Sequence, residues 1–325
     1  MTADSVLHVS VVIPVYRGER TLERVVGELL ALTEPTPVDG MTYRIDEIVL
    51  VHDGAMDDSA RVMQHLALAH PCTRVIWLTR NFGQHAATLA GMAATTAPWV
   101  ATIDEDGQQD PRDIGALLAG AIKADLPLAY AAPVNASGHG LFRNALSGIV
   151  HWLFIHPLGN RHIGVFNSFR VIDGEIARSL AAYCSHSVFL DAALSWVVHG
   201  AVHVPVRLRE QETRPSGYSL RSLSNHFLRL LITTGTRPLR FIASLGLLSI
   251  LVAVGLTAYA IWVKFFSQTQ PVSAQGWTSL VIVISFFSGC ILFALGVIAE
   301  YLAVALGIVM GKPLYLVSSR PRSRR

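Results

Sequence analysis

The chain has 325 residues, of which 51% are hydrophobic and 15% are charged, and its formal net charge is +3. Soluble globular proteins usually carry about 25% charged residues. The composition therefore argues against a purely soluble enzyme, and it excludes a disordered chain, a collagen-like or coiled-coil rod and a small disulfide-stapled scaffold. The first 230 residues contain no dense basic stripe, so no nucleic-acid partner is expected.

Strand and helix patterns alternate through the first 124 residues. Val9–Val15 is a continuous apolar, β-branched run, and 21–32 has apolar residues at helical spacing. The alternation then repeats, with strands predicted at 47–51, 74–78 and 99–103 and helices at 60–69, 84–95 and 113–124. Because the strands are apolar throughout, the pattern predicts an α/β fold with a mostly parallel, Rossmann-like sheet covered on both faces.

Polar clusters follow each of these four strands. They are Tyr16–Glu19, His52–Gly54 with Asp57 and Asp58, Arg80–Gln84, and Asp104–Gln108. Ligands of parallel sheets bind beyond the carboxyl ends of the strands. The four clusters therefore predict the rim of one crevice.

The cluster after the fourth strand has the chemistry of a metal site. In an extended segment Asp104 and Asp106 point to the same side, and Gln108 continues the alternation with an amide oxygen. Two carboxylates and an amide oxygen suit a hard cation such as Mg²⁺ or Mn²⁺. The alternative is a solvated acidic turn with Gly107 at the bend. A calcium loop is excluded because its sixth and twelfth positions are Gln109 and Gly115.

Two long uncharged apolar runs follow residue 239. Phe241–Val263 and Trp277–Ala299 are each 23 residues long, and a membrane-spanning helix needs about 20. Basic residues flank the runs on the outside: Arg237 and Arg240 before the first, and Lys312, Arg320, Arg322, Arg324 and Arg325 after the second. The positive-inside rule then predicts a multi-pass protein of the cell membrane, with the N-terminal domain and both termini in the cytoplasm.

The predicted domain organisation follows from these runs. Residues 1–219 form a cytosolic catalytic domain, 220–238 an interfacial amphipathic helix, 239–312 a transmembrane hairpin of two helices, and 313–325 a basic cytoplasmic tail. The run 149–158 is either a second surface helix or a buried one. Two short spans enclose little volume, which is compatible with a homo-oligomer.

Cysteine usage and the N-terminus agree with a cytosolic domain. Cys72, Cys184 and Cys290 are far apart and form no CxxC pair, which favours a reducing compartment without a zinc site or disulfide framework. Met1–Ser10 has neither a basic region nor a long apolar stretch, so no secretory signal is expected.

The chain resembles family 2 glycosyltransferases with a GT-A fold. The segments VVIPVYRGERTLE, VHDGAMDDS, LTRNFGQHAATLAG, DEDGQQDP and RPSGYSLRSL occur in the family's order, and the resemblance covers about residues 9–318. It is strongest to polyprenyl-phosphate sugar transferases of the dolichyl-phosphate mannose synthase and bactoprenol glucosyl transferase types. The resemblance implies transfer of a sugar, with inversion, from a nucleotide diphosphate sugar to a polyprenyl phosphate.

The resemblance also implies roles for individual residues. Pro14, Val15 and Tyr16 line the nucleotide pocket, Asp53 binds the base, Arg80 and Asn81 support the nucleotide, and Asp104, Asp106 and Gln108 hold the divalent ion. Arg170 lies near the acceptor phosphate, and Ser216, Tyr218, Ser219 and Arg221 form a loop over the phosphates, where Arg221 neutralises the leaving diphosphate. Asp191 is a candidate base or acceptor-orienting residue, or else a helix cap. Arg209 and Arg214 either contact a phosphate or are solvated.

The sequence departs from the family pattern at several positions. His52 replaces an aspartate, Arg17 an asparagine, Gly217 a lysine of the phosphate loop, and Ser168 an acid. A phosphate acceptor is largely ionised at pH 7, since its second pKa is about 6, so it tolerates the loss of an acid at 168. Two alternatives remain open: a glycosyltransferase with a hydroxyl acceptor, which needs a true base, and a degenerate homologue that binds nucleotide sugars or scaffolds a membrane complex.

Overall fold

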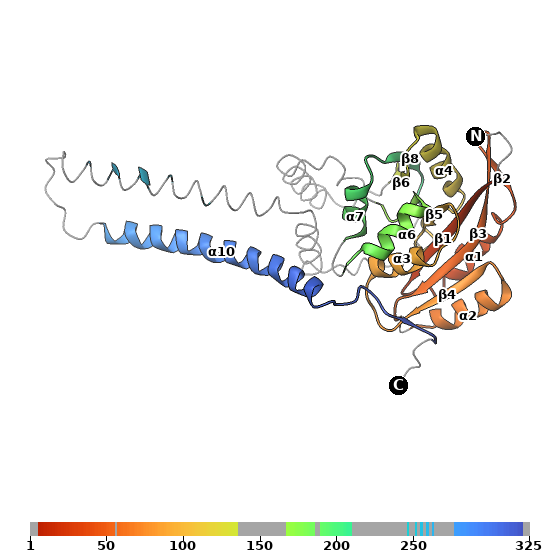
Figure 1. The fold of residues 1–325 in the computed structure, drawn as a ribbon, viewed down its shortest axis with the longest axis horizontal. Coiled ribbons are helices and arrows are strands. Elements are labelled where there is room, and N and C mark those ends of the chain that lie inside the picture. The colour runs from red at the N-terminus through yellow and green to blue at the C-terminus, as the bar shows by residue number, and fades with distance from the viewer. Residues whose placement is uncertain are drawn as a thin grey trace. The chain divides into compact units, whose positions relative to one another are not determined.

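The computed structural model describes residues 6–55, 57–135, 167–185, 189–209 and 276–320, with a few single positions between 246 and 262. The chain divides into two compact units (Figure 1). Unit 1 comprises Met1–Tyr218 together with Pro313–Arg325, and unit 2 comprises Ser219–Lys312. The C-terminal residues thus belong to the same unit as the N-terminal domain.

The predicted alternation of strands and helices is confirmed in unit 1. Its first half contains β1 (Leu7–Val15), α1 (Leu22–Leu30), β2 (Thr36–Val38), β3 (Met41–His52), α2 (Ser59–Ala69), β4 (Thr73–Leu78), α3 (Gln84–Ala93), β5 (Trp99–Thr102) and α4 (Asp113–Ala124). Beyond the predicted elements come β6 (Leu128–Pro133), β7 (Arg170–Asp173), α6 (Gly174–Tyr183), α7 (Leu190–Val197), β8 (Val202–Val206) and β9 (Val317–Ser318).

Nine strands of the described residues form one sheet, in the order β8-β6-β7-β5-β1-β3-β4-β9, with β2 paired to β3. The central pairs β1–β3, β1–β5 and β3–β4 are parallel, as the sequence predicts. β7 is antiparallel to both of its neighbours, β5 and β6. This strand brings Arg170 beside Thr102, at the carboxyl end of β5.

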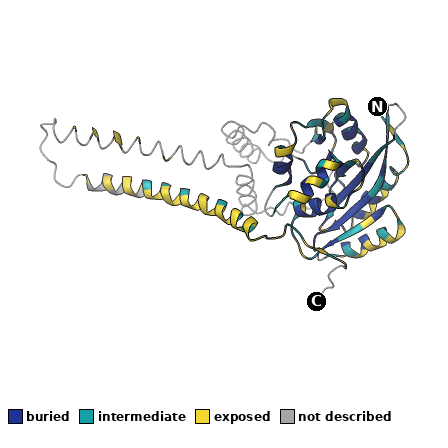
Figure 2. Ribbon diagram, viewed as in Figure 1, coloured by how far each residue is buried: buried dark blue, intermediate teal, exposed yellow. Residues whose placement is uncertain are grey.

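Helices cover both faces of the sheet, and the alternation of side chains along β1 separates two apolar cores. Val9, Val11 and Ile13 pack on one face with α1, α2 and α4, whereas Val12 packs on the other with α3, α6 and α7. Figure 2 shows the strands as the buried layer between the helices. Buried on both faces, the sheet is a rigid platform for the loops at its carboxyl edge.

The segment after unit 2 returns to the sheet. β9 pairs antiparallel with β4, and the Thr79 amide donates to the carbonyl oxygen of Leu316 over 2.9 Å. Leu314 and Tyr315 pack against the apolar core on the α3 face. Part of the segment expected to be a basic tail, 313–325, is thus an edge strand of the sheet, and 321–325 lie outside the described residues.

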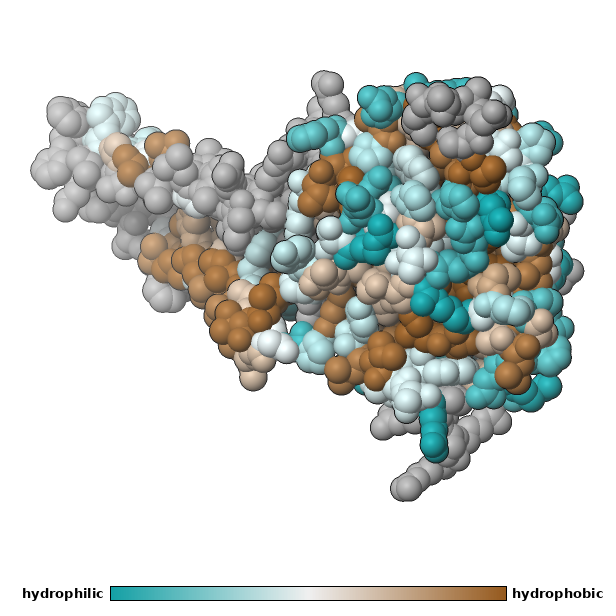
Figure 3. All heavy atoms as spheres, turned by 45° about the vertical axis from the view of Figure 1, so that its right-hand side comes forward, coloured by the Kyte–Doolittle hydropathy of each residue, from teal (hydrophilic) through white to brown (hydrophobic). Residues whose placement is uncertain are grey.

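Unit 2 contains α10 (Trp277–Val309), a helix of 33 residues. Its stretch Phe286–Val309 has 24 residues with a mean hydropathy of 2.3 and no buried part, and by length and composition it can cross a membrane. Hydrophobic side chains are exposed along this helix (Figures 2 and 3). Among the described residues, α10 is the only helix that is long and apolar enough to cross a membrane. The first predicted span, 241–263, the interfacial helix 220–238 and the run 149–158 lie outside the described residues apart from single positions.

Candidate functional site

A pocket of about 360 Å³ lies at the carboxyl edge of the sheet. It is lined by Pro14, Val15, Tyr16, Asp53, Asn81, Gly83, Gln84, Asp104, Glu105 and Asp106. These residues follow or end β1, β3, β4 and β5, so all four strand ends of the predicted crevice contribute to one cavity. Seven of them are residues that the sequence analysis assigned to nucleotide or metal. Arg80 does not line the pocket, and its guanidinium lies 4.4 Å from the centroid of the Phe82 ring.

Asp53 ties the end of β3 to the loop after β4. Its two carboxylate oxygens accept hydrogen bonds from the backbone amides of Phe82, at 2.7 Å, and Gly83, at 2.9 Å. Burial raises the pKa of Asp53, and these two hydrogen bonds oppose the rise. The carboxylate that the family resemblance assigns to the base therefore also fixes the backbone beside Asn81.

Gly54 lets the same two loops approach closely. Its φ is +66°, and a Cβ built there would lie 2.5 Å from the Asn81 nitrogen and 2.7 Å from the Arg80 carbonyl carbon. A backbone contact of this kind can be relieved only by moving the loop. Gly40 has a similar φ of +81°, but nothing lies within 4 Å of its Cβ position.

These two glycines form a matched pair of test positions. We expect Gly40→Ala to lower the free energy of unfolding by about 1 kcal/mol, the cost of a left-handed alanine. Gly54→Ala should lower it further and weaken binding of the nucleotide that the family resemblance implies by at least about tenfold, because the Arg80–Asn81 backbone is displaced. Denaturant unfolding and nucleotide titration of both variants test this, and equal effects of the two substitutions would contradict it.

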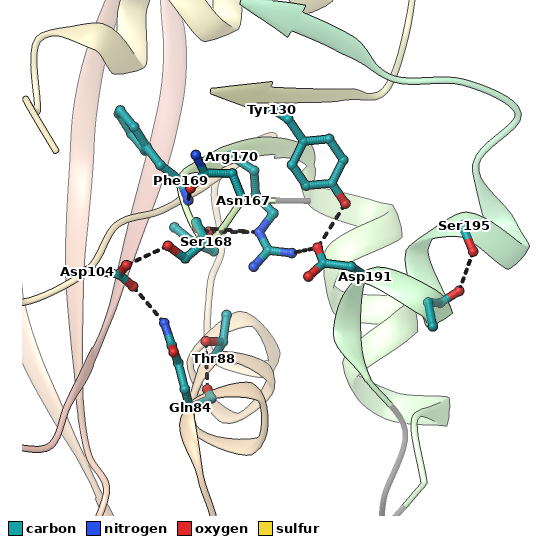
Figure 4. A network of polar contacts seen from close by, with 12 residues as sticks. Gln84, Thr88, Asp104, Tyr130, Asn167, Ser168, Phe169, Arg170, Asp191 and Ser195 are labelled. Atoms are coloured by element: carbon teal, nitrogen blue, oxygen red, sulfur yellow. Dashed lines mark hydrogen bonds and ion pairs between the residues drawn. The ribbon is translucent and has the colours of Figure 1, made fainter. Parts of the chain in front are cut away.

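Asp104 is held by three side chains from three parts of the fold. Its oxygens accept hydrogen bonds from Gln84 at 2.7 Å and Ser168 at 2.5 Å (Figure 4). They also accept one from Gln109 at 3.0 Å. Burial raises the pKa of Asp104, and the nearby Asp106 carboxylate adds to the rise. Ser168, which stands where the family often has an acid, thus orients the Asp104 carboxylate.

Asp106 interacts within its own loop. Its carboxylate accepts from the Gln108 amide at 3.0 Å and from the Gln108 side-chain nitrogen at 2.6 Å. Among the described residues, no three His, Cys, Asp or Glu side chains form a group that could hold a metal ion. Two carboxylates facing a pocket suit Mg²⁺ or Mn²⁺ when the remaining ligands come from phosphates and water.

Glu105 was not assigned a role from the sequence. It accepts hydrogen bonds from the backbone amides of Tyr16 at 2.6 Å and Arg17 at 2.8 Å. Burial raises the pKa of Glu105 to about 7, against the effect of these hydrogen bonds. Glu105 and Asp106 lie in a turn beyond the end of β5, so the expected extended alternation does not hold there and the sequence contains no signal for this contact.

Arg170 and Asp191 form a buried ion pair with each other (Figure 4). Their side chains are 3% and 5% exposed, and the Tyr130 hydroxyl donates to the same Asp191 oxygen at 2.9 Å. Burial and the Asp191 charge raise the pKa of Tyr130, so it stays a donor. Arg170 also donates to Thr102 Oγ1 at 3.2 Å. Each charge has its partner inside the protein, and the roles of both residues toward an acceptor stay predictions.

Arg209, which follows β8, contacts the loop that carries Asp104 and Asp106. Its amide donates to the Gln108 carbonyl at 2.7 Å, and its guanidinium pairs with Glu28 at 2.8 Å and Asp110 at 2.9 Å. Arg209 is therefore an ion-paired side chain and not a freely solvated one, and its predicted phosphate contact stays a prediction. Arg214, Ser216, Tyr218, Ser219 and Arg221 lie outside the described residues.

Comparisons with known proteins agree with this architecture. The structure is similar to mannosyl-3-phosphoglycerate synthase from Rubrobacter xylanophilus, with a TM-score of 0.51 and 19% identity over 83% of this chain and 80% of the other. It is also similar to glucosyl-3-phosphoglycerate synthase from Mycobacterium tuberculosis in complex with Mn²⁺, uridine diphosphate and phosphoglyceric acid, with a TM-score of 0.51 and 19% identity over 72% and 80% of the two chains. The fold is therefore GT-A-like α/β.

The family model "Glycosyl transferase family 2" matches residues 10–177, and the chain belongs to this family, as predicted. It is 30% identical to the undecaprenyl-phosphate 4-deoxy-4-formamido-L-arabinose transferase of Klebsiella pneumoniae subsp. pneumoniae, over 98% of this chain and 94% of that one. It is 29% identical to the protein of the same name from Enterobacter sp., over 98% and 95% of the two chains.

Proposed function

We propose that this glycosyltransferase transfers a sugar from a nucleoside diphosphate sugar to a polyprenyl phosphate at the cytoplasmic face of the cell membrane. The observation that carries the proposal is the pocket in which Asp104 and Asp106 meet Asp53 and Tyr16. The relatives named as undecaprenyl-phosphate sugar transferases support the acceptor, because the similarity extends over nearly the whole chain and includes the apolar C-terminal helix.

The donor's nucleoside would occupy the part of the pocket formed by Pro14, Val15, Tyr16 and Asp53, with Asn81 beside it. Asp104 and Asp106, with Gln108 next to them, would hold a divalent ion at the diphosphate. The ion would neutralise charge on the leaving diphosphate. A neighbour of the same fold binds Mn²⁺ together with uridine diphosphate, which supports a divalent ion and a nucleotide donor.

The proposed reaction needs no strong general base from the protein. A phosphate monoester is largely ionised at pH 7, so it can attack the anomeric carbon without a strong general base. The pairing of Asp191 with Arg170 and Tyr130 fits this scheme, because the carboxylate is already engaged by two partners inside the protein. A single in-line displacement would invert the anomeric centre. Ser216, Tyr218, Ser219 and Arg221 are proposed to close over the phosphates.

The acceptor's location requires a membrane anchor. We assign α10 and the predicted span 241–263 to a transmembrane hairpin, and the basic residues outside both runs support a cytoplasmic location of the two termini. The catalytic domain would then meet the phosphate of a lipid whose chain stays in the bilayer.

The full-length protein in lipid nanodiscs, with a panel of labelled UDP-, GDP- and CDP-sugars and undecaprenyl phosphate, tests the function. We expect a labelled lipid product from one class of donor, with Mg²⁺ or Mn²⁺ and not with EDTA. No product from any donor would contradict the proposal. Transfer to a hydroxyl-bearing lipid alone would identify the alternative acceptor, and nucleotide binding without turnover would identify a degenerate homologue.

A further inference from the structure

Glu105 lies between Asp104 and Asp106 in the sequence, but its hydrogen bonds go to a different loop. Asp104 bonds to Gln84, Gln109 and Ser168, and Asp106 bonds to Gln108. Glu105 reaches instead to a loop 88 and 89 residues earlier in the chain, between β1 and α1. Three consecutive acids thus serve two different parts of the site.

The two hydrogen bonds of Glu105 are bidentate on consecutive amides. Oε2 accepts from the Tyr16 nitrogen at 2.6 Å, and Oε1 accepts from the Arg17 nitrogen at 2.8 Å. The next amide, that of Gly18, donates to Ser59 Oγ at 2.8 Å. Three successive amides of this loop are therefore satisfied by side chains from other elements, and Glu105 supplies two of the three acceptors.

The loop held in this way is a wall of the pocket. Tyr16 lines the cavity and is 41% exposed. The loop also packs tightly on its clamp, because a Cβ at Gly18 would lie 3.3 Å from Glu105 Oε2 and 3.1 Å from Val15 Cγ1. Without the carboxylate, two amides at the base of this wall would lose their acceptors, and of the three only the Gly18 amide would still be held, by Ser59. The position of the wall relative to Asp104 and Asp106 would then be less well fixed.

We propose that Glu105 is a positioning residue that holds the Tyr16–Arg17 wall at a fixed spacing from the Asp104–Asp106 pair and so sets the affinity for the nucleoside part of the donor. The inference rests on the proposed function of the pocket. One peptide segment carries both the carboxylates for the diphosphate side and the clamp for the nucleoside side. The spacing between the two half-sites is therefore set by the covalent geometry of residues 104–106.

The test compares nucleotide binding with metal binding in the full-length protein. UDP, GDP and CDP are titrated in the presence of Mn²⁺, and Mn²⁺ alone is titrated by electron paramagnetic resonance. Glu105→Gln keeps the size of the side chain but turns an NH₂ group toward an amide donor. We expect the Kd of the preferred nucleotide, and the donor KM, to rise about ten- to hundredfold, with kcat within about threefold and Mn²⁺ affinity unchanged.

Three comparisons make the result specific. Glu23→Gln, at an exposed position of α1, should change neither binding constant. Asp106→Ala should weaken Mn²⁺ binding. Ser59→Ala, which removes only the acceptor of the Gly18 amide, should raise the nucleotide Kd in the same direction as Glu105→Gln, and it also tests the clamp if Glu105→Gln fails to fold.

Two outcomes would overturn the inference while leaving the proposed function intact. Equal loss of Mn²⁺ affinity in Glu105→Gln and Asp106→Ala would make Glu105 a metal ligand. Unchanged nucleotide binding in Glu105→Gln, where the wild-type protein binds nucleotide, would show that the wall needs no clamp. If the wild-type protein bound none of the three nucleotides, the proposed function would fail and this inference with it.

Discussion

Replacing Asp106 by alanine is expected to lower sugar transfer by about a thousandfold or more while changing the free energy of unfolding by less than about 1 kcal/mol. The hydrogen bonds of the Asp106 carboxylate lie within its own loop, to Gln108, so the substitution removes no link between elements. A divalent ion contributes several kcal/mol of transition-state stabilisation, and each 1.36 kcal/mol is worth tenfold in rate. Turnover with Mn²⁺ and denaturant unfolding measure the two effects.

Asp104 provides the contrast. Asp104→Ala removes the acceptor of Gln84, Gln109 and Ser168, so it should lose both activity and stability. Asp39→Asn serves as the control for loss of one negative charge, because Asp39 pairs with Lys123 at the surface and its left-handed backbone suits asparagine. An Asp106→Ala variant with more than a tenth of wild-type turnover would remove Asp106 from the metal site.

Breaking the buried ion pair should have the largest effect on stability. Arg170→Ala and Asp191→Ala are each expected to lower the free energy of unfolding by about 3–5 kcal/mol, because each leaves an uncompensated charge in the core. The double variant Arg170→Met/Asp191→Leu should regain a large part of this loss, since it removes both charges together. Urea titrations of the wild-type protein and these three variants, followed by tryptophan fluorescence, measure the differences.

The same variants decide the role of Asp191. Lys123→Ala breaks a surface pair whose lysine side chain is 60% exposed, and it should cost no more than about 1 kcal/mol. An Asp191→Ala variant as stable as the Lys123→Ala variant, yet inactive, would contradict the structural role. It would instead support a general base and a hydroxyl acceptor.

The polar residues at the ends of the four central strands were the part of the site that the sequence predicted best. The C-terminal parts of β1, β3, β4 and β5 are apolar and largely buried, with Asp53 directly after β3 and Asp104 and Asp106 within four residues of β5. Apolar runs and strand ends were therefore enough to place these residues together. The Glu105 clamp depends on a partner loop almost 90 residues away, and nothing in the acidic triplet alone specifies that partner.

The second half of the domain was harder to predict for physical reasons. β6 reads LAYAAP, without the β-branched residues that mark a strand, and β7 has four residues. β7 lies antiparallel between β5 and β6, and this pairing depends on the tertiary fold and not on the local sequence. The position of β7 brings Arg170 to Asp191. β9 has two residues, too few for any periodic pattern.

The pairing of β9 with β4 also sets an order of events in biosynthesis. Trp77 and Leu78 meet Ser318 and Val317, about 240 residues later in the chain. While the ribosome is still translating, the β4 edge lies open, and an open edge can pair with other chains. The ribosome has finished α10 before Val317 is added, so the catalytic sheet gains its last strand only after the apolar helix exists. A nonsense codon between residues 107 and 317 would therefore leave the β4 edge without β9, even with every pocket residue present.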